Sequence, residues 1–242
     1  MGKPLWIIGN WKMNQDYLQI DSYLERFEQA LNNPKVNFAL AVNYTLLKKV
    51  RQSGIEGLKT FAQNVSEFNP GAYTGETSAL MLSSLGIEGA IIGHSERRQH
   101  FGETDLIVRK KLKQLLANRL TPIVCVGETL LERQQEKTEK VIIEQLATIF
   151  AKFKKFDDFI IAYEPLWAIG TGQTATPEQA QKVARLIRKQ TAKDVRILYG
   201  GSVSADNVAA FLTQPDVDGV LVGGASLDPK GFAQIISEAE RV

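Results

Sequence analysis

The regular alternation of short apolar runs with longer amphipathic stretches is the feature that most constrains the fold. Most of the apolar runs are continuous, which is typical of strands covered on both faces of a parallel sheet. The eight expected strands are Leu5–Gly9, Val36–Val42, Leu58–Gln63, Gly89–Gly93, Pro122–Val126, Phe159–Tyr163, Arg196–Tyr199 and Gly219–Val222. Because no linker or low-complexity segment divides the chain, we expect one domain over residues 1–242.

Helical patterns occupy the intervals between these runs. The clearest are Tyr17–Leu31, Asp105–Asn118, Glu132–Phe150 and Pro177–Gln190. Strands that alternate with helices form βαβ units, and eight such units in 242 residues predict a (β/α)8 barrel, because this α/β fold of eight parallel strands with outer helices takes ~250 residues. An open doubly wound sheet is the structural alternative that strand counting leaves open.

Composition and charge exclude several classes of protein. Lys and Arg total 29 against 27 for Asp and Glu, a net charge of +2, whereas a dedicated nucleic-acid binder usually carries a clustered basic face. No apolar run approaches the length of a membrane span. Cys125 is the only cysteine, so no intrachain disulfide is possible. We therefore expect a soluble cytoplasmic protein that binds neither nucleic acid nor membrane.

Neither a metal nor a cofactor is expected. Two histidines and one cysteine, widely spaced, form no cluster of metal ligands. Gly170–Ala175 fits a variant of the dinucleotide-binding fingerprint, but that motif needs its first glycine directly after a strand. The sixth expected strand ends at Tyr163, and Pro165 intervenes.

A barrel predicts that functional residues follow the strands, because the loops at the carboxyl ends of the strands form the active face. Asn10 and Lys12 follow the first expected strand, His94 the fourth and Glu164 the sixth. Lysines in such loops are more often solvated surface charges, but Lys12 has the chemistry to neutralise a phosphate and a nearby oxyanion.

His94 stands where the fourth strand gives way to a helix. The positive end of the helix disfavours a charged imidazole, so we expect a neutral side chain that donates a hydrogen bond to a carbonyl. A structural histidine fits this segment about equally well. The neighbouring Glu96 is expected to pair with Lys12 or Arg97.

Glu164 is the candidate general base. At the end of an apolar strand and beside Trp167, its pKa is expected to be raised toward the working range of a base. The segment that follows, through Ile169 and the glycines Gly170 and Gly172, suits a lid that closes over substrate and excludes water. A packed structural loop is the weaker alternative.

Paired glycines follow the last two expected strands. Gly200-Gly201, before Ser202, and Gly223-Gly224 would let backbone N–H groups approach a phosphate closely. Each pair alone is compatible with a simple turn, but both lie in the two loops where phosphate-binding barrels hold the anion.

Taken together, these residues resemble the triosephosphate isomerase family over nearly the whole chain. The motifs that carry the resemblance are GNWKMN at Gly9–Asn14, GAYTGE at Gly71–Glu76, GHSERR at Gly93–Arg98, CVGE at Cys125–Glu128, AYEPLWAIGTG at Ala162–Gly172, YGGS at Tyr199–Ser202 and LVGGASL at Leu221–Leu227. The resemblance implies a TIM barrel that interconverts dihydroxyacetone phosphate and D-glyceraldehyde 3-phosphate through an enediolate, in glycolysis and gluconeogenesis, without a cofactor.

The resemblance also implies roles for particular residues. Glu164 would move the proton, His94 would polarise the carbonyl, and Lys12 and Asn10 would stabilise the developing charge. The phosphate would be held by Gly170, Gly172, Ser202, Gly223 and Gly224, and the lid supported by Trp167, Tyr199 and Glu128. The loop Asn64 to Ala79 would insert into a second subunit, which implies a homodimer; an ordinary surface excursion is the alternative.

Departures from the family pattern fall outside the assigned catalytic roles. Ala41–Tyr44 replaces the usual Ala-Pro-Pro after the second strand, and Gln173 stands where the lid often has lysine, which puts lid kinetics in question. A phosphate-binding barrel is compatible with two other functions: a pentose-phosphate epimerase, which often needs a metal, and a catalytically inactive sugar-phosphate-binding barrel that acts as a regulator or interaction protein. The presence of Lys12, His94 and Glu164 together favours the isomerase.

Overall fold

The computed structural model describes residues 4–151, 153, 159–168, 174–192 and 194–242. Within them eight strands close into one barrel, and each strand is parallel to both of its neighbours. The strands are β1 Trp6–Asn10, β2 Asn37–Val42, β3 Leu58–Ala62, β4 Gly89–Ile92, β5 Thr121–Val126, β6 Ile160–Tyr163, β7 Arg196–Tyr199 and β8 Gly219–Val222. The predicted barrel is confirmed, and the pairing of β1 with β8 excludes the open sheet.

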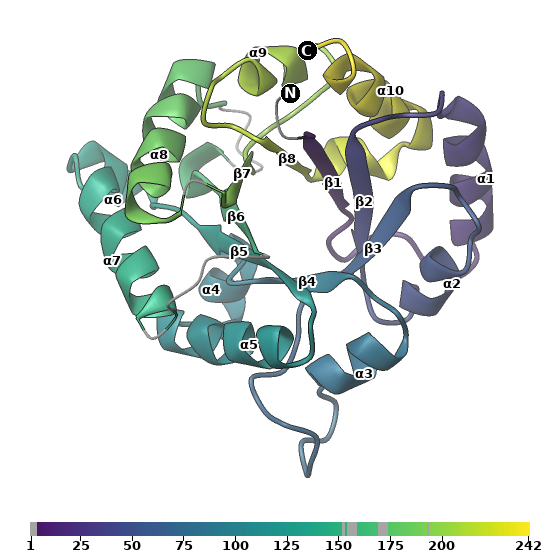
Figure 1. Ribbon diagram of the computed structural model, residues 1–242, viewed down its shortest axis with the longest axis horizontal. Helices are drawn as coiled ribbons and strands as arrows, with labels where there is room; N and C mark the ends of the chain where they lie inside the picture. Colours follow the sequence, from purple (N-terminus) through teal and green to yellow (C-terminus); the bar gives the residue numbers. More distant parts are fainter. Residues whose placement is uncertain (1–3, 152, 154–158, 169–173, 193) are drawn as a thin grey trace.

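Helices surround this barrel in an outer ring (Figure 1). They are α1 Ile20–Ala30, α2 Leu47–Arg51, α3 Ala79–Ser84, α4 Ser95–Phe101, α5 Asp105–Ala117, α6 Leu130–Gln134, α7 Thr138–Phe150, α8 Pro177–Gln190, α9 Val208–Leu212 and α10 Pro229–Ala239. Short 3₁₀ helices follow β6 at Leu166–Ala168 (η1) and β8 at Gly224–Leu227 (η2). None of the helices in the described ranges has the length and apolar character needed to span a membrane.

The single helix predicted over Glu132–Phe150 is wrong, because the segment forms two helices. Helix α6 begins after Thr129, whose side chain and that of Glu132 form a capping box. The chain then breaks at Glu136, which has a left-handed backbone with φ of 57°. A residue with this left-handed conformation cannot continue a right-handed helix, so a new helix, α7, begins at Thr138.

Buried apolar side chains form two layers that the barrel wall separates. The inner layer fills the barrel with Ile8, Ala39, Phe61, Leu198 and further side chains of the same strand faces. The outer layer packs the opposite strand faces against the helices. Since successive side chains on a strand point to opposite sides, every second residue of a strand lies inside the barrel. The two ends of the interior are therefore the places where inward polar residues meet solvent.

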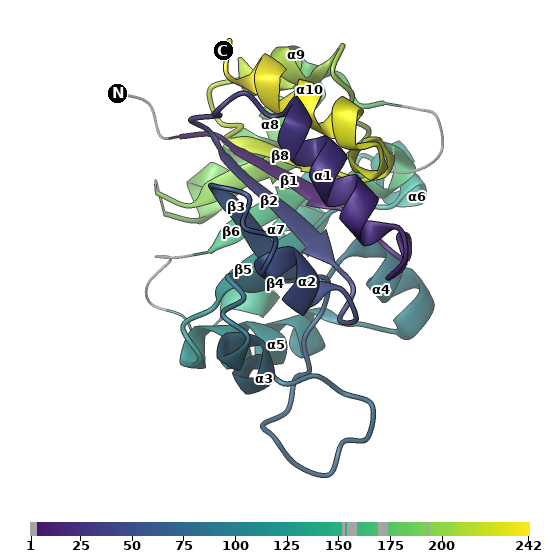
Figure 2. The ribbon, with the colours of Figure 1, turned by 90° about the vertical axis from the view of Figure 1, so that its right-hand side faces the viewer.

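The segment between β3 and α3 extends well beyond the ring of helices (Figures 1 and 2). Side chains of α5 hold its base: the Lys111 ammonium donates to Asn64 Oδ1 at 2.7 Å, Lys110 pairs with Glu67 at 2.6 Å, and Gln114 Nε2 donates to the Glu67 carbonyl at 3.3 Å. Nearer the tip, the rings of Phe68 and Tyr73 stack with centroids 4.2 Å apart, and both remain partly exposed.

Candidate active site

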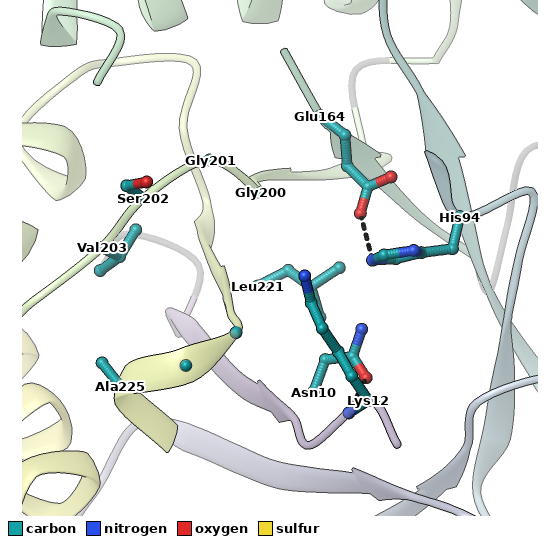
Figure 3. A pocket seen from close by; sticks show the side chains of 12 residues that line it. Asn10, Lys12, His94, Glu164, Gly200, Gly201, Ser202, Val203, Leu221 and Ala225 are labelled. Atoms are coloured by element: carbon teal, nitrogen blue, oxygen red, sulfur yellow. Dashed lines mark hydrogen bonds and ion pairs between the residues drawn. The ribbon is translucent and has the colours of Figure 1, made fainter. Parts of the chain in front are cut away.

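A cavity of about 410 Å³ opens at the carboxyl ends of the strands. Its walls come from β1, β4, β6, β7 and β8, in agreement with the rule that such barrels place function at this end. The lining residues are Asn10, Lys12, His94, Glu164, Gly200, Gly201, Ser202, Val203, Leu221, Gly223, Gly224 and Ala225. Figure 3 shows Glu164, His94 and Lys12 converging on one side, with Ser202, Val203 and Ala225 on the other.

A left-handed backbone aims Lys12 into the cavity. Its φ of 53° is unfavourable for a residue with a side chain, by roughly 1–2 kcal/mol. Asn10 Oδ1 accepts from the Lys12 backbone N–H at 3.1 Å, and Gln63 Nε2 donates to the Lys12 carbonyl at 2.8 Å and approaches Asn10 Oδ1 at 3.3 Å. Gln63 ends the third predicted strand, and sequence reasoning assigned it no role although the strand-end rule pointed to it.

The His94 imidazole is buried at the N-terminus of α4 and links the helix to Glu164. Its Nδ1 accepts from the backbone N–H of Glu96 at 3.3 Å, so the proton of a neutral ring lies on Nε2. That nitrogen lies 3.0 Å from Glu164 Oε1. Figure 3 draws this contact across the mouth of the barrel. The neutral tautomer therefore presents an Nε2–H donor to the cavity.

The expectation of a raised pKa for Glu164 is not met in this structure. The carboxylate is 2% exposed, and burial raises its pKa, but the charge and hydrogen bond of His94 together with the Ser95 N–H, which donates to Oε2 at 2.9 Å, hold the pKa below its ordinary value. The Trp167 indole donates to Glu128. As predicted, Glu164 lies directly after an apolar strand, β6, but the sequence contained no sign that the N-terminal turn of α4 would face it.

The same pair moves the pKa of His94 upward. Burial lowers it, but the charge and hydrogen bond of Glu164, assisted by Glu96, outweigh burial and the opposing charge of Lys12. Whether the His94 imidazole is neutral, as the helix terminus led us to expect, thus depends on the group that faces Nε2. While Glu164 occupies that place, a proton on His94 is stabilised by the carboxylate.

Ion pairs around the cavity settle the open question about Glu96. Lys12 Nζ lies 2.6 Å from Glu96 Oε1, whereas Arg97 pairs with Glu103 at 2.7 Å. Glu103 also accepts from the buried Lys111 at 2.6 Å and from the Gly93 N–H at 2.8 Å. This second network, which sequence reasoning missed, fixes the turn that carries His94.

The glycine pairs after β7 and β8 also line the cavity, with Gly200 beside Glu164 and Gly223 beside Lys12. A side chain at Gly201 would collide with the Tyr199 hydroxyl, and one at Gly200 would press on Glu164 Cγ at 3.0 Å. The absence of a side chain at these two glycines therefore allows Tyr199 and Glu164 to take their observed positions. The Ser202 hydroxyl donates to the carbonyl of Ala168 at 2.9 Å.

Glu128 fastens the chain beyond β6. Its carboxylate is fully buried, and Oε1 accepts from the Tyr163 hydroxyl at 3.1 Å and from the Trp167 indole at 3.0 Å. Arg133 approaches the same oxygen at 3.3 Å and lies over the Trp167 ring at 4.1 Å. These contacts hold η1, which leads into the segment predicted to be a lid.

Part of the predicted site lies outside the described residues. This applies to Ile169, Gly170, Gly172 and Gln173. Tyr199 is buried and stacks on Phe211 at 4.1 Å. Among the described residues, no group of His, Cys, Asp and Glu is arranged to hold a metal ion.

Comparison with known proteins gives one consistent result. A family model described as triosephosphate isomerase matches residues 5–239. The triosephosphate isomerase of Mesomycoplasma hyorhinis is 49% identical, over 96% of this chain and 97% of its own length. That of Paracidovorax citrulli is 47% identical over 99% and 100%, and that of Taenia solium 42% over 98% and 99%.

Proposed function

The chain belongs to the triosephosphate isomerase family, and we propose that Glu164, His94, Lys12 and Asn10 carry its reaction. It is an isomerase that interconverts dihydroxyacetone phosphate and D-glyceraldehyde 3-phosphate by proton transfer through an enediolate. In this proposal Glu164 removes and returns the proton on carbon. His94 donates from Nε2 to the substrate carbonyl, and the Lys12 ammonium with the Asn10 amide stabilises the oxyanion.

The contact between His94 and Glu164 has a consequence for this reaction. A carboxylate whose pKa is held down by His94 and Ser95 is a weak base. A substrate carbonyl that takes the Nε2–H bond of His94 would separate the pair, and burial, the largest influence on Glu164, would then raise its pKa. Substrate binding would in this way both polarise the carbonyl and activate the base.

The phosphate is proposed to lie beside the loops that follow β7 and β8. Ser202, Gly223 and Gly224 would hold it there, together with Gly170 and Gly172. The Lys12 ammonium would share its charge between phosphate and oxyanion. Glu128 and Trp167, joined at 3.0 Å, and the buried Tyr199 are proposed to support the lid. Water exclusion by the lid would protect the enediolate from phosphate elimination.

The 3.0 Å approach of His94 Nε2 to Glu164 inside the cavity is the observation that carries this assignment. The test is a coupled isomerase assay on wild type and Glu164→Gln, without added metal or nucleotide. Loss of the base should lower kcat by ~10²–10⁴-fold. Glu139→Gln, an exposed carboxylate on α7, is the matched control and should keep full activity. Full activity of Glu164→Gln would refute the assignment, and an inactive wild type would favour the non-catalytic barrel.

We further propose that the enzyme is a homodimer through the loop Asn64 to Ala79. A second cavity, of about 290 Å³, adjoins Lys12 and His94 and is lined in part by Met13, Tyr44 and Phe101. Met13 is 96% exposed and Phe101 69%, so apolar surface faces solvent beside the active site. The projecting loop of a second copy would cover it, with Thr74 near its tip.

The dimer is tested by light scattering after gel filtration. Met13→Arg should shift the protein to the monomer and reduce kcat/KM, because the covered apolar surface becomes charged. Ile143→Arg, at an exposed apolar position on α7, is the control and should stay dimeric. A dimer that persists in Met13→Arg would contradict this use of the loop.

The cytoplasm remains our proposed location, consistent with a single unpaired cysteine, and residues 1–242 our proposed single domain.

A further inference from the structure

The end of the barrel opposite the active site carries two cations. On β3, Phe61 belongs to the inner layer, so Lys59, two residues earlier, faces the same interior at its other end. On β7, Leu198 and Arg196 are related in the same way. Because β3 and β7 stand four strands apart in an eight-stranded closed barrel, both side chains extend toward the axis from opposite walls.

Neutral groups hold the Lys59 ammonium over the interior. Its Nζ donates to Asn37 Oδ1 at 2.6 Å and lies 4.5 Å from the centre of the Trp6 ring, which contacts Phe61 edge-on. Burial lowers the pKa of Lys59, and the charge of Glu88 only opposes that shift. The Glu88 carboxylate is itself engaged at 2.7 Å by the backbone N–H of Thr60.

Arg196 is still less satisfied. Its Nη1 is buried and has no hydrogen-bond partner among the residues that the structure describes. Within the described ranges, no salt bridge of 4.0 Å or less joins a carboxylate to Lys59 or to Arg196. A buried guanidinium nitrogen without a partner is destabilising unless an anion supplies one.

We propose that this end of the barrel binds a small tetrahedral oxyanion, inorganic phosphate or the phosphate of a larger molecule, between Lys59 and Arg196. The planar guanidinium suits a bidentate contact with two anion oxygens, and the ammonium adds a mobile point charge. Asn37 can turn its amide N–H toward the same ligand, and Trp6 shields one side. This site lies at the opposite end of the strands from the catalytic phosphate, so the two can be filled together.

Trp6 provides a local probe. Inorganic phosphate is titrated at constant ionic strength, balanced with sodium chloride, while the fluorescence of Trp6 is followed by difference from Trp6→Phe. The catalytic site is read separately from the inhibition constant of phosphate in the isomerase assay. Lys59→Gln and Arg196→Gln should each weaken the Trp6-reported affinity at least tenfold and leave that inhibition constant and kcat/KM unchanged.

Control variants distinguish binding at Lys59 and Arg196 from a general effect of ionic strength and from misfolding. Lys48→Gln, an exposed lysine on α2, should bind like wild type. Arg196→Lys keeps the positive charge but loses the planar guanidinium that can contact two anion oxygens, so its affinity should fall only in part. This variant keeps the proposal testable if Arg196→Gln fails to fold. The same titration with a two-carbon phosphate ester distinguishes the two sources of the anion. Tighter binding of the ester than of inorganic phosphate would identify the ligand as the phosphate group of a larger molecule, and tighter binding of inorganic phosphate would identify it as the free anion. No saturable response, the same response to chloride, or equal affinity in Lys59→Gln and Lys48→Gln would overturn the proposal.

Discussion

Replacing Gln63 by leucine removes the side chain that holds the backbone of the Lys12 loop. The Gln63 amide nitrogen has two hydrogens and approaches three acceptors: Asn10 Oδ1 at 3.3 Å, the Lys12 carbonyl at 2.8 Å and the Ala41 carbonyl at 3.0 Å. At most two full hydrogen bonds are therefore lost, about 2 kcal/mol of stability at ~1 kcal/mol each. The Ala41 carbonyl keeps a second donor, the Trp11 N–H, whereas no other described residue donates to the Lys12 carbonyl.

The loss at Lys12 has a further effect on activity. Its left-handed backbone stores roughly 1–2 kcal/mol that can be released once the Gln63 contact is gone. Relaxation moves the ammonium away from the oxyanion, so the population of competent sites falls by a corresponding factor. Since 1.36 kcal/mol is tenfold in rate, kcat/KM should fall roughly 5- to 30-fold.

The matched control is Gln181→Leu on α8. Gln181 is also half-buried and makes two hydrogen bonds, to Asp216 Oδ2 at 2.7 Å and from the Asp216 N–H at 3.0 Å. Urea unfolding should show similar losses of stability in both variants, and the coupled assay a loss of activity only in Gln63→Leu. If Gln63→Leu loses stability but keeps kcat/KM within about twofold of Gln181→Leu, the strain argument for Lys12 is refuted.

Two further predictions concern buried groups behind the site. Burial raises the pKa of Glu103, but Lys111, Arg97 and the Gly93 N–H outweigh burial and lower it. The ionised Glu103 carboxylate therefore stabilises the fold fully above its pKa in the unfolded chain, about 4.3, and this stabilisation is lost as the pH falls through its lower pKa in the folded protein. Glu103→Gln should cost at least ~3 kcal/mol in urea unfolding at pH 7 and less near pH 3; an equal cost at both would contradict the ionic role. Burial raises the pKa of Cys125, so a thiol reagent should modify the protein only after unfolding, and rapid labelling of folded enzyme would show an exposed thiol.

Local sequence patterns predicted most of the fold because their physical basis is local. Continuous apolar runs marked all eight strands to within a few residues, and Thr176, Pro177 and Gln179 open α8 with a capping box. The break at Glu136 was missed because a left-handed residue other than glycine leaves little trace in an amphipathic pattern.

What the sequence determined about the site was the identity of its residues and the end of the barrel at which they gather. Asn10, His94 and Glu164 each end or follow a strand, and closure of the barrel brings them to one cavity. The tertiary structure alone decided which groups face each other: a carboxylate expected to have a raised pKa meets His94 and the N–H of Ser95, and its pKa is lowered. Electrostatic shifts depend on distances of a few ångströms between residues far apart in the chain, and only packing sets those distances.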